Sequence, residues 1–387
     1  MMKDKDIYFF LGIGGIGMSA LAQHLLRHGQ HVLGYDRRPS GITEKLESLG
    51  AEISFSKQPD MELPPETKVI YTPAIQQEDP WFQFAKNCDP AMRKRSELLQ
   101  EICNEMQCLA VAGTHGKTTT SAILCHLLTE LGAAPTAFLG GVLKGADSNY
   151  LAGQDRLCVV EADEYDRSFL KLHPQHAVIT SVEADHLDVY GSERDYVQAF
   201  IDFRRQVEGH CFIERHLTLK GTTYGFAHAE HAVQNLRISE MAYHFDWVGP
   251  AFQQTVKFPY PGKHNVLNAL GAAALCSEMG YAVTDIAKAL SSFPGVKRRF
   301  ELLYHSQRHV YYDDYAHHPG ELAVLIESLR EWHPDKPLTM IFQPHLFSRT
   351  RDHMTEFAEV LSRVDHLILM PIYPAREKPI YGISSEV

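Results

Sequence analysis

Short apolar runs alternate with helical patterns along most of the chain. An apolar run at 7–11 precedes a pattern of helical period at 18–28, and a second apolar run follows at 31–35. Strands that are buried between helices carry such continuous runs, so this order predicts a β-α-β unit. The same signals predict strands at 69–71, 108–112, 157–160, 177–181, 310–312, 338–342 and 366–370, and helices at 121–131 and 320–332. The chain is therefore expected to have an α/β fold.

Composition narrows the class of protein. The 387 residues exceed the usual size of one compact domain, so two or three domains are expected. A net charge of −11 argues against general binding to nucleic acid or anionic membranes. No apolar run approaches the roughly 20 residues of a membrane span, and we expect a cytoplasmic protein without membrane insertion. The seven cysteines lack Cys-x-x-Cys spacing and are predicted to be buried free thiols.

The segment 113–120, Gly-Thr-His-Gly-Lys-Thr-Thr-Thr, joins an apolar run to a helical pattern. Glycines at such a junction let backbone N–H groups face an anion, and the helix start adds its positive end. The lysine and a threonine hydroxyl complete a site for a nucleoside triphosphate and Mg²⁺. The loop is a shortened form of the common phosphate loop, which would need a glycine at Val111. The predicted nucleotide-binding residues are Gly113, Thr114, His115, Gly116, Lys117, Thr118 and Thr119.

A second glycine-rich segment, Gly-Ile-Gly-Gly-Ile-Gly at 12–17, lies between the first predicted strand and helix. Asp36 follows about 20 residues later, where a carboxylate can bind a ribose hydroxyl. This spacing predicts a pyrophosphate at a helix N-terminus. NAD and a UDP-sugar both contain a pyrophosphate, and the spacing does not distinguish them. The selected residues are Gly12, Gly14, Gly15, Gly17 and Asp36.

Acidic residues follow two further predicted strands. Glu161 comes directly after the run at 157–160, where a protein with a phosphate loop carries a Mg²⁺ ligand. A solvated acidic loop is the alternative there. The segment 183–188, Glu-Ala-Asp-His-Leu-Asp, follows the next strand, and its crowded carboxylates favour a cation. His186 is the predicted second metal ligand.

Polar residues also mark later segments. Asn265 and Asn268 share one face of an Ala-rich helical pattern beside His264, where buried amides can read a purine edge, although capping alone explains one Asn. The loops 313–319 and 343–349 each follow a predicted strand. Open α/β sheets bind ligands at the carboxyl ends of their strands, so these loops predict a second doubly wound unit with a binding site.

Together these motifs resemble those of the Mur ligases, the ATP-dependent amide-forming enzymes of peptidoglycan synthesis, over essentially the whole chain. Within that family the chain is most similar to the branch that adds L-alanine. The segments that carry the resemblance are Gly-Ile-Gly-Gly-Ile-Gly-Met-Ser at 12–19, Gly-Thr-His-Gly-Lys-Thr at 113–118, Glu-Ala-Asp-Glu at 161–164, Glu-Ala-Asp-His-Leu-Asp at 183–188, His-Asn-Val-Leu-Asn at 264–268, Asp-Asp-Tyr-Ala-His-His-Pro at 313–319 and Tyr-Pro-Ala-Arg-Glu-Lys-Pro at 373–379.

The resemblance implies three domains: an N-terminal Rossmann-like domain at 1–104 that binds a UDP-sugar, a central P-loop ATPase-like domain at 105–297 with a mostly parallel sheet, and a C-terminal Rossmann-like domain at 298–387. It implies a reaction that joins the lactyl carboxylate of UDP-N-acetylmuramate to L-alanine through an acyl phosphate, with release of ADP and phosphate. The implied cofactors are ATP and Mg²⁺, with two ions for which Mn²⁺ can substitute. A monomer or weak dimer is expected.

The resemblance also implies roles for single residues. Lys117 would neutralise the β- and γ-phosphates, Thr118 and Glu161 would hold one metal ion, and His186 would hold the second. Arg349 would pair with the carboxylate of the incoming alanine, and His318 is a candidate base for its ammonium group. The residues implied to seat ATP are His264, Asn265, Asn268, Arg299 and Asp314. The further substrate-binding residues are Arg95, His318, His345 and Arg349.

Some features depart from the family pattern. No lysine lies between Lys171 and Lys220, so the carbamylated lysine of several relatives is missing, in agreement with the alanine-adding branch. Leu346 stands where some relatives carry an arginine, and Ser181 replaces a frequent asparagine. The sequence ends at Val387, before elements that continue in relatives. We therefore expect an uncovered sheet edge and apolar face, and low stability, in an incomplete third domain.

Three other functions remain open from the sequence. A salvage ligase that joins a whole tripeptide to UDP-N-acetylmuramate shares most motifs, although the segments 342–345 and 373–377 favour single alanine. An NAD-dependent oxidoreductase fits residues 12–36 but leaves the phosphate loop unexplained. A non-catalytic nucleotide-binding protein must account for intact Lys117, Glu161 and His186.

Overall fold

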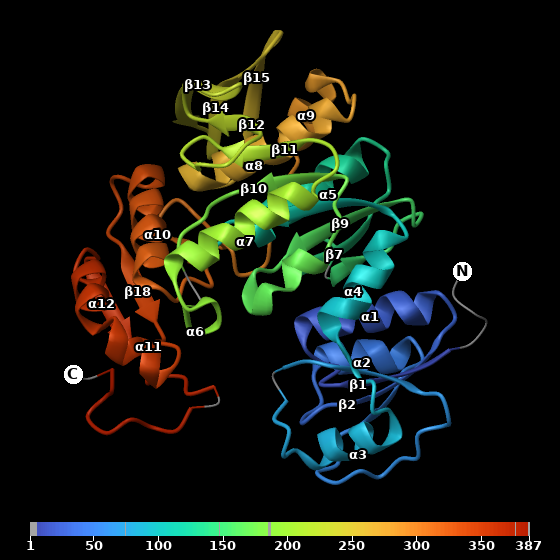
Figure 1. Cartoon of the computed structure of the whole chain (residues 1–387). Coiled ribbons are helices and arrows are strands. Elements are labelled where there is room, and N and C mark those ends of the chain that lie inside the picture. Colours follow the sequence, from blue (N-terminus) through green and yellow to red (C-terminus); the bar gives the residue numbers. More distant parts are fainter. Residues whose placement is uncertain (1–5, 74, 147, 185–186, 376, 386–387) are drawn as a thin grey trace.

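The computed structural model describes residues 6–73, 75–146, 148–184, 187–375 and 377–385. These residues form three units in chain order, and the first and third lie on opposite sides below the central one (Figure 1). Within the described ranges, no helix has the length and apolar character that crossing a membrane requires.

The N-terminal unit is a parallel sheet with the strand order β3-β2-β1-β4-β5. Its strands are β1 (Ile7–Leu11), β2 (His31–Tyr35), β3 (Glu52–Ser54), β4 (Lys68–Tyr71) and β5 (Arg93–Lys94), and its helices are α1 (Ile16–Arg27), α2 (Gly41–Ser48), α3 (Pro80–Cys88) and α4 (Arg95–Asn104). The predicted β-α-β unit is confirmed. Because β1 runs directly into α1, the glycine loop lies at the carboxyl edge of this sheet.

The central unit is a ten-stranded sheet with the order β15-β14-β13-β12-β11-β10-β6-β9-β7-β8. Its strands are β6 (Gln107–Ala112), β7 (Thr136–Leu143), β8 (Ser148–Leu151), β9 (Leu157–Ala162), β10 (His176–Ile179), β11 (Cys211–Glu214), β12 (Thr222–Gly225), β13 (His231–Ser239), β14 (Ala242–Gly249) and β15 (Phe252–Phe258). The neighbouring strands from β13 through β12, β11, β10, β6 and β9 to β7 pair in parallel, so the sheet is mostly parallel, as predicted. The outer strands β14, β15 and β8 pair antiparallel with their neighbours.

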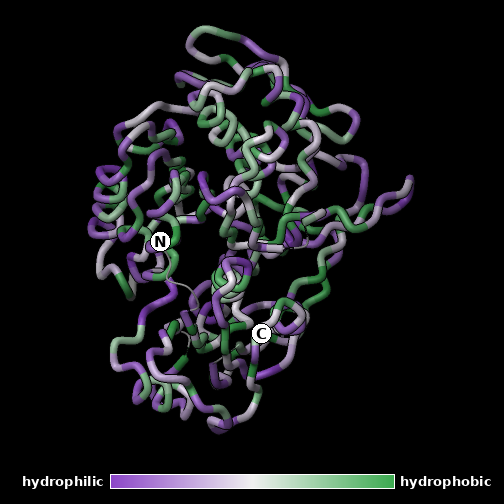
Figure 2. Tube along the Cα trace, turned by 90° about the vertical axis from the view of Figure 1, so that its right-hand side faces the viewer, coloured by the Kyte–Doolittle hydropathy of each residue, from purple (hydrophilic) through white to green (hydrophobic). Residues whose placement is uncertain are grey.

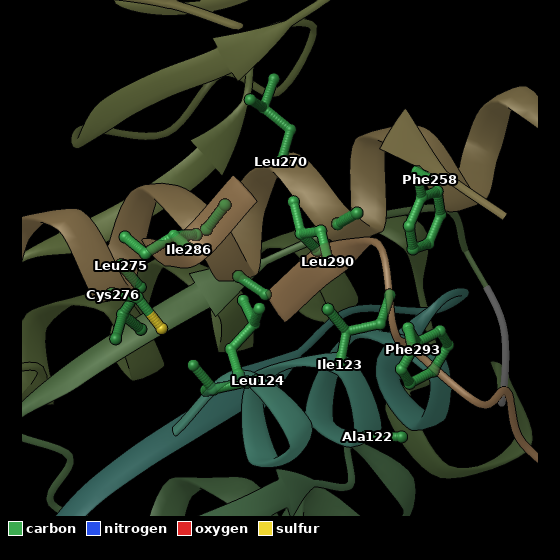
Figure 3. Close-up of a cluster of buried hydrophobic side chains, with 14 of the residues drawn as sticks. Ala122, Ile123, Leu124, Phe258, Leu270, Leu275, Cys276, Ile286, Leu290 and Phe293 are labelled. Atoms are coloured by element: carbon green, nitrogen blue, oxygen red, sulfur yellow. The ribbon is translucent and has the colours of Figure 1, made fainter. Parts of the chain in front are cut away.

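Helices fix the phosphate loop against this sheet. They are α5 (Lys117–Glu130), the 3₁₀ helix η1 (Tyr165–Lys171), α6 (Leu187–Tyr190), α7 (Glu193–Gln206), α8 (Lys263–Glu278) and α9 (Val283–Leu290). Figure 3 shows Ile123 of α5 facing Leu290 of α9, in the apolar cluster that also holds Leu124 of α5 and Leu275 of α8. Every residue from 119 to 128 is buried, so α5 is covered on all sides and its first turn is held rigidly.

The C-terminal unit contains β16 (Glu301–His305), β17 (Val310–Asp313), α10 (Pro319–Trp332), β18 (Thr339–Phe342), α11 (Phe347–Asp352), α12 (Met354–Leu361) and β19 (His366–Leu369). Its described strands form two separate pairs, antiparallel β16–β17 and parallel β18–β19, where one doubly wound sheet was expected. A four-residue apolar run identifies a strand but not its neighbour, because such a run fits many sheet edges.

The strands of the C-terminal unit carry exposed apolar side chains. Leu303 is 50% exposed, Ile341 60% and Ile368 50%. Elsewhere the hydropathy trace of Figure 2 has hydrophobic residues mainly in the interior and hydrophilic ones on the projecting loops. The apolar face of this unit is therefore an exception to the burial seen in the other two.

Candidate active site

Two glycines shape the phosphate loop between β6 and α5. Gly113 has φ +142°, and a Cβ there would lie 2.1 Å from Thr180 Oγ1. Gly116 has φ +81°, and its Cβ would lie 2.6 Å from Asn268 Oδ1. A side chain at either position would meet both backbone strain and a steric clash. The loop therefore has the close backbone approach that a phosphate cradle requires.

The segment after β10 braces this loop. The His115 backbone N–H donates to Ser181 Oγ at 2.8 Å, and the Thr114 hydroxyl donates to the Glu183 carbonyl at 2.8 Å. Thr114 Oγ1 also lies 2.8 Å from the Tyr196 hydroxyl. The predicted strand at 177–181 ends at Ile179, so Ser181 is free of the ladder and can bond the loop. Sequence reasoning noted Ser181 only as a departure and missed its contact.

Lys117 is held by a residue that the sequence analysis did not select. Its ammonium group lies 2.7 Å from Glu164 Oε2 and donates to the Gly113 carbonyl at 2.6 Å. Burial raises the pKa of Glu164, and the charge of Lys117 offsets this only in part. Glu164 lies three residues after Glu161 in the same acidic segment, and that segment was the signal that could have identified it.

Glu161 and Thr118, the predicted ligands of one metal ion, lie within hydrogen-bonding distance of each other. The Thr118 hydroxyl donates to Glu161 Oε1 at 3.1 Å, and the Gly140 N–H donates to Oε2 at 2.9 Å. Burial raises the pKa of Glu161, while Lys117 lowers it to a smaller extent. A divalent cation would supply the positive charge that this carboxylate lacks, and a hydroxyl with a carboxylate is an oxygen ligand set that suits Mg²⁺. His186 lies outside the described residues.

The start of α8 abuts the phosphate loop. Asn265 donates its amide to the Pro261 carbonyl at 2.6 Å, and Asn268 donates to Asn265 Oδ1 at 3.1 Å. Both side chains are buried, and Asn268 Oδ1 faces Gly116. His264 is exposed on the same first turn. The structure thus brings together the phosphate loop and the amides that the sequence selected.

The carboxylate of Asp36 accepts a hydrogen bond from the glycine loop of the N-terminal unit. Its Oδ2 accepts the Gly14 N–H at 2.8 Å, and its Oδ1 accepts the Arg37 N–H at 2.7 Å. Asp36 therefore holds the loop in shape, beyond the ribose contact that the spacing suggested. A Cβ on Gly17 would lie 3.0 Å from the Arg95 side chain, which forms an ion pair with Asp163 at 3.6 Å.

An open pocket of about 550 Å³ joins the first two units. Its walls include the glycine loop and Arg95 at one end and Glu161 at the other. The lining residues of most interest are Gly12, Gly14, Gly15, Gly17, Asp36, Arg95, Gly140, Glu161 and Asp163. A ligand that binds the glycine loop by a pyrophosphate can therefore extend to the metal-site carboxylate within one cavity.

The residues selected for the amino acid form a separate cluster in the C-terminal unit. The ring of His345 stacks on Tyr373 with centroids 5.6 Å apart, and Arg349 Nη1 lies 3.3 Å from His345 Nδ1. The rings of His318 and His353 lie 5.4 Å apart. Burial and the adjacent Arg349 lower the pKa of His345. The helices α10 and α11 lie well apart from α5 in Figure 1.

Arg299 and Asp314 lie at the connection between the central and C-terminal units. Asp314 accepts the Phe300 N–H at 2.6 Å and the Ala316 N–H at 2.7 Å. The Arg299 guanidinium lies 5.6 Å from the Tyr315 ring centroid. Phe300 has φ +45°, an uncommon backbone conformation for a residue other than glycine. These two residues therefore order the connecting segment.

Three family models match the chain in the order of its three units. The model described as "Mur ligase family, catalytic domain" matches residues 7–107, "Mur ligase middle domain" matches 111–276, and "Mur ligase, glutamate ligase domain" matches 298–386. Together they span nearly the whole chain. The protein belongs to the Mur ligase family.

Curated relatives of this Mur ligase agree with the family models. The UDP-N-acetylmuramate–L-alanine ligase of Christiangramia forsetii is 45% identical over 399 residues, which cover 99% of this chain and 88% of the relative. The enzyme of the same name from Flavobacterium psychrophilum is 45% identical over 386 residues, with coverages of 97% and 86%.

Solved structures give the same result for the fold. The UDP-N-acetylmuramate-alanine ligase of Thermotoga maritima matches with a TM-score of 0.85 and 31% identity, over 95% of this chain and 85% of that one. A murein peptide ligase from Psychrobacter arcticus matches with a TM-score of 0.71 and 24% identity, over 94% and 84% of the two chains. The second likeness shows the shared Mur ligase fold alone.

Proposed function

We propose that this Mur ligase joins the lactyl carboxylate of UDP-N-acetylmuramate to L-alanine, with ATP converted to ADP and phosphate. The observation that carries the proposal is the shared pocket, because it connects the glycine loop of the N-terminal unit to Glu161 beside the phosphate loop. The UDP-sugar would place its pyrophosphate on the glycine loop and its carboxylate near Glu161. The names of the relatives at 45% identity support the same substrates.

The reaction needs activation because a carboxylate is a poor electrophile. A carboxylate oxygen attacks the γ-phosphorus of ATP and ADP leaves; the amine of alanine then attacks the acyl carbon, phosphate leaves, and the nitrogen loses its extra proton. Lys117 would move from Glu164 to the β- and γ-phosphates, and Thr118 and Glu161 would hold a metal ion. Mg²⁺ at that site neutralises phosphate charge when bound, and we propose a second ion at His186, with Mn²⁺ as a substitute.

The remaining predicted residues require motion of the C-terminal unit. We propose that the segment at 297–300 acts as a hinge, so that closing brings His318, His345 and Arg349 to the acyl phosphate and excludes water. His264, Asn265 and Asn268 would seat ATP beside the loop, with Arg299 and Asp314 at the hinge. Arg349 would pair with the carboxylate of alanine.

The test is phosphate release from ATP and Mg²⁺ with UDP-N-acetylmuramate, measured with and without L-alanine. Release that requires both substrates supports the proposal. Release with the tripeptide in place of alanine would assign the chain to the salvage reaction, and failure to bind UDP-N-acetylmuramate would reject both ligase functions. The proposed working form is a monomer or weak dimer in the cytoplasm, acting on small-molecule substrates.

A further inference from the structure

A cluster of three possible metal ligands lies where the N-terminal and central units meet. His24 lies in the last turn of α1, and His28, four residues later, directly follows that helix. Asp155 lies between β8 and β9. One donor atom from each residue lies within 4.8 Å of the other two. None of the three lines the pocket of the active site.

His28 and Asp155 are already oriented for a shared ligand. Nδ1 of His28 donates to the His24 carbonyl at 2.8 Å, which leaves Nε2 directed at Asp155 Oδ2, also at 2.8 Å. The other oxygen, Asp155 Oδ1, accepts the Thr136 hydroxyl at 2.8 Å. In metal sites, such outer hydrogen bonds set the tautomer of a ligating histidine and orient a ligating carboxylate.

His24 completes the cluster from the buried side. Its ring centroid lies 4.2 Å from that of His28, and its Nδ1 lies 3.1 Å from the Tyr150 hydroxyl. Burial and the neighbouring His28 lower the pKa of His24 to about 4. A neutral imidazole is the form that binds metals.

We propose that His24, His28 and Asp155 form a Zn²⁺ site that joins the N-terminal unit to the central unit. Two imidazoles and one carboxylate are a ligand set that Zn²⁺ accepts, with water in the fourth position. Ligand atoms on tetrahedral zinc lie about 3.4 Å apart. This spacing falls between the 2.8 Å from His28 Nε2 to Asp155 Oδ2 and the 4.8 Å that bounds the cluster, so small side-chain movements would fit the ion. The nitrogen ligands separate this site from the all-oxygen Mg²⁺ site at Glu161.

The position of the site gives it a structural role. The amide of Asn149, at the β8 strand, already donates to the carbonyl of Ile16 at the start of α1. A metal bound by His24, His28 and Asp155 would fix the other end of the same helix to the same unit. Because the glycine loop directly precedes α1, Zn²⁺ would hold that loop in place over the pocket of the proposed function.

The test uses the full chain after treatment with a chelator, in buffer with excess Mg²⁺. Zn²⁺ is titrated by calorimetry into the wild type, His28→Gln and Asp155→Asn. The matched control is His31→Gln, because His31 also pairs with a carboxylate, Glu52 at 2.9 Å, but lies outside the cluster. We expect one tight site in the wild type and the control, and affinity at least about 100-fold weaker in the other two variants.

Equal Zn²⁺ affinity in all four proteins, or no tight binding in the wild type, would overturn the site and leave only a hydrogen-bonded cluster. Far-UV circular dichroism checks that the variants fold. If they do not, Co²⁺ bound to the wild type decides the question by X-ray absorption, since two imidazole nitrogens support the site and an all-oxygen shell rejects it. These outcomes are independent of phosphate release, so the test does not depend on the proposed ligase activity.

Discussion

Nζ of Lys117 lies 2.7 Å from Oε2 of Glu164, in an ion pair whose side chains are only 13% and 3% exposed. The lysine that a phosphate loop offers to its ligand is thus already bound to a carboxylate. In the proposed reaction, an incoming phosphate replaces Glu164 as the partner of Lys117. Because both groups are buried, the strength of this pair should affect both nucleotide binding and stability.

Lys117→Ala is expected to abolish turnover while UDP-sugar binding persists, because Lys117 is not part of the pocket that contains the glycine loop. The unfolding free energy should also fall by about 3 kcal/mol, since Glu164 would remain buried without its cation. Phosphate release and calorimetry with the UDP-sugar measure the two activities. Lys171→Ala, which removes a more exposed pair with Glu97, is the control, and appreciable turnover in Lys117→Ala would refute the assignment.

Glu164→Gln is expected to tighten binding of ADP without Mg²⁺ several-fold. The amide keeps the size of the carboxylate but not its charge, so Lys117 becomes available to a phosphate at lower cost. Isothermal titration of ADP against the wild type and the variant measures the difference. Glu97→Gln serves as control, and an unchanged ADP affinity in Glu164→Gln would show that the pair does not compete with the nucleotide.

Glu161 should make stability depend on pH in a defined direction. Burial raises the pKa of its carboxyl in the folded state, so the folded state binds this proton more tightly than the unfolded chain does. Its contribution is most favourable below the ordinary glutamate pKa of about 4.3 and is lost as the pH rises through the raised value. Without Mg²⁺, the Tm of Glu161→Gln minus that of the wild type should grow from pH 4 to pH 8. A difference that is constant with pH contradicts this, whereas added Mg²⁺ should shrink it.

Gly140→Ala is expected to raise the Mg²⁺ concentration needed for half-maximal activity by about tenfold. The added methyl group would lie 2.4 Å from Glu161 Oε2 and push that side chain out of its place beside Thr118. The backbone of Gly140 is not left-handed, so the fold should survive. Gly41→Ala, where a Cβ meets nothing within 4 Å, is the control. Equal Mg²⁺ requirements in both variants would argue against a metal at Glu161.

Binding of an ATP analogue together with the UDP-sugar is expected to make the molecule more compact. The cluster at His345 and Arg349 must approach the phosphate loop if it binds the amino acid, and the proposed hinge at 297–300 would permit this movement. Small-angle X-ray scattering with and without both ligands measures the radius of gyration. Identical scattering curves would count against closure and against a role for this cluster in the proposed reaction.

Local pattern in the sequence was enough to locate many elements and the main motifs. Strands β1 and β2 begin and end where their apolar runs do, and α10 begins one residue before the predicted start. The phosphate loop and the glycine loop were also recognised, because each needs a few residue types at fixed spacing. Side-chain period and turn chemistry are local properties, and a single sequence displays them directly.

Tertiary structure decided the partners. Lys117 and Glu164 are 47 residues apart in sequence, and no local pattern indicates that they form an ion pair. The antiparallel strands β14 and β15, the separate pairing of β17, and the pocket between Arg95 and Glu161 also depend on contacts between distant segments. Apolar periodicity specifies which face of an element is buried but not which element covers it, so these features appear only once the chain is folded.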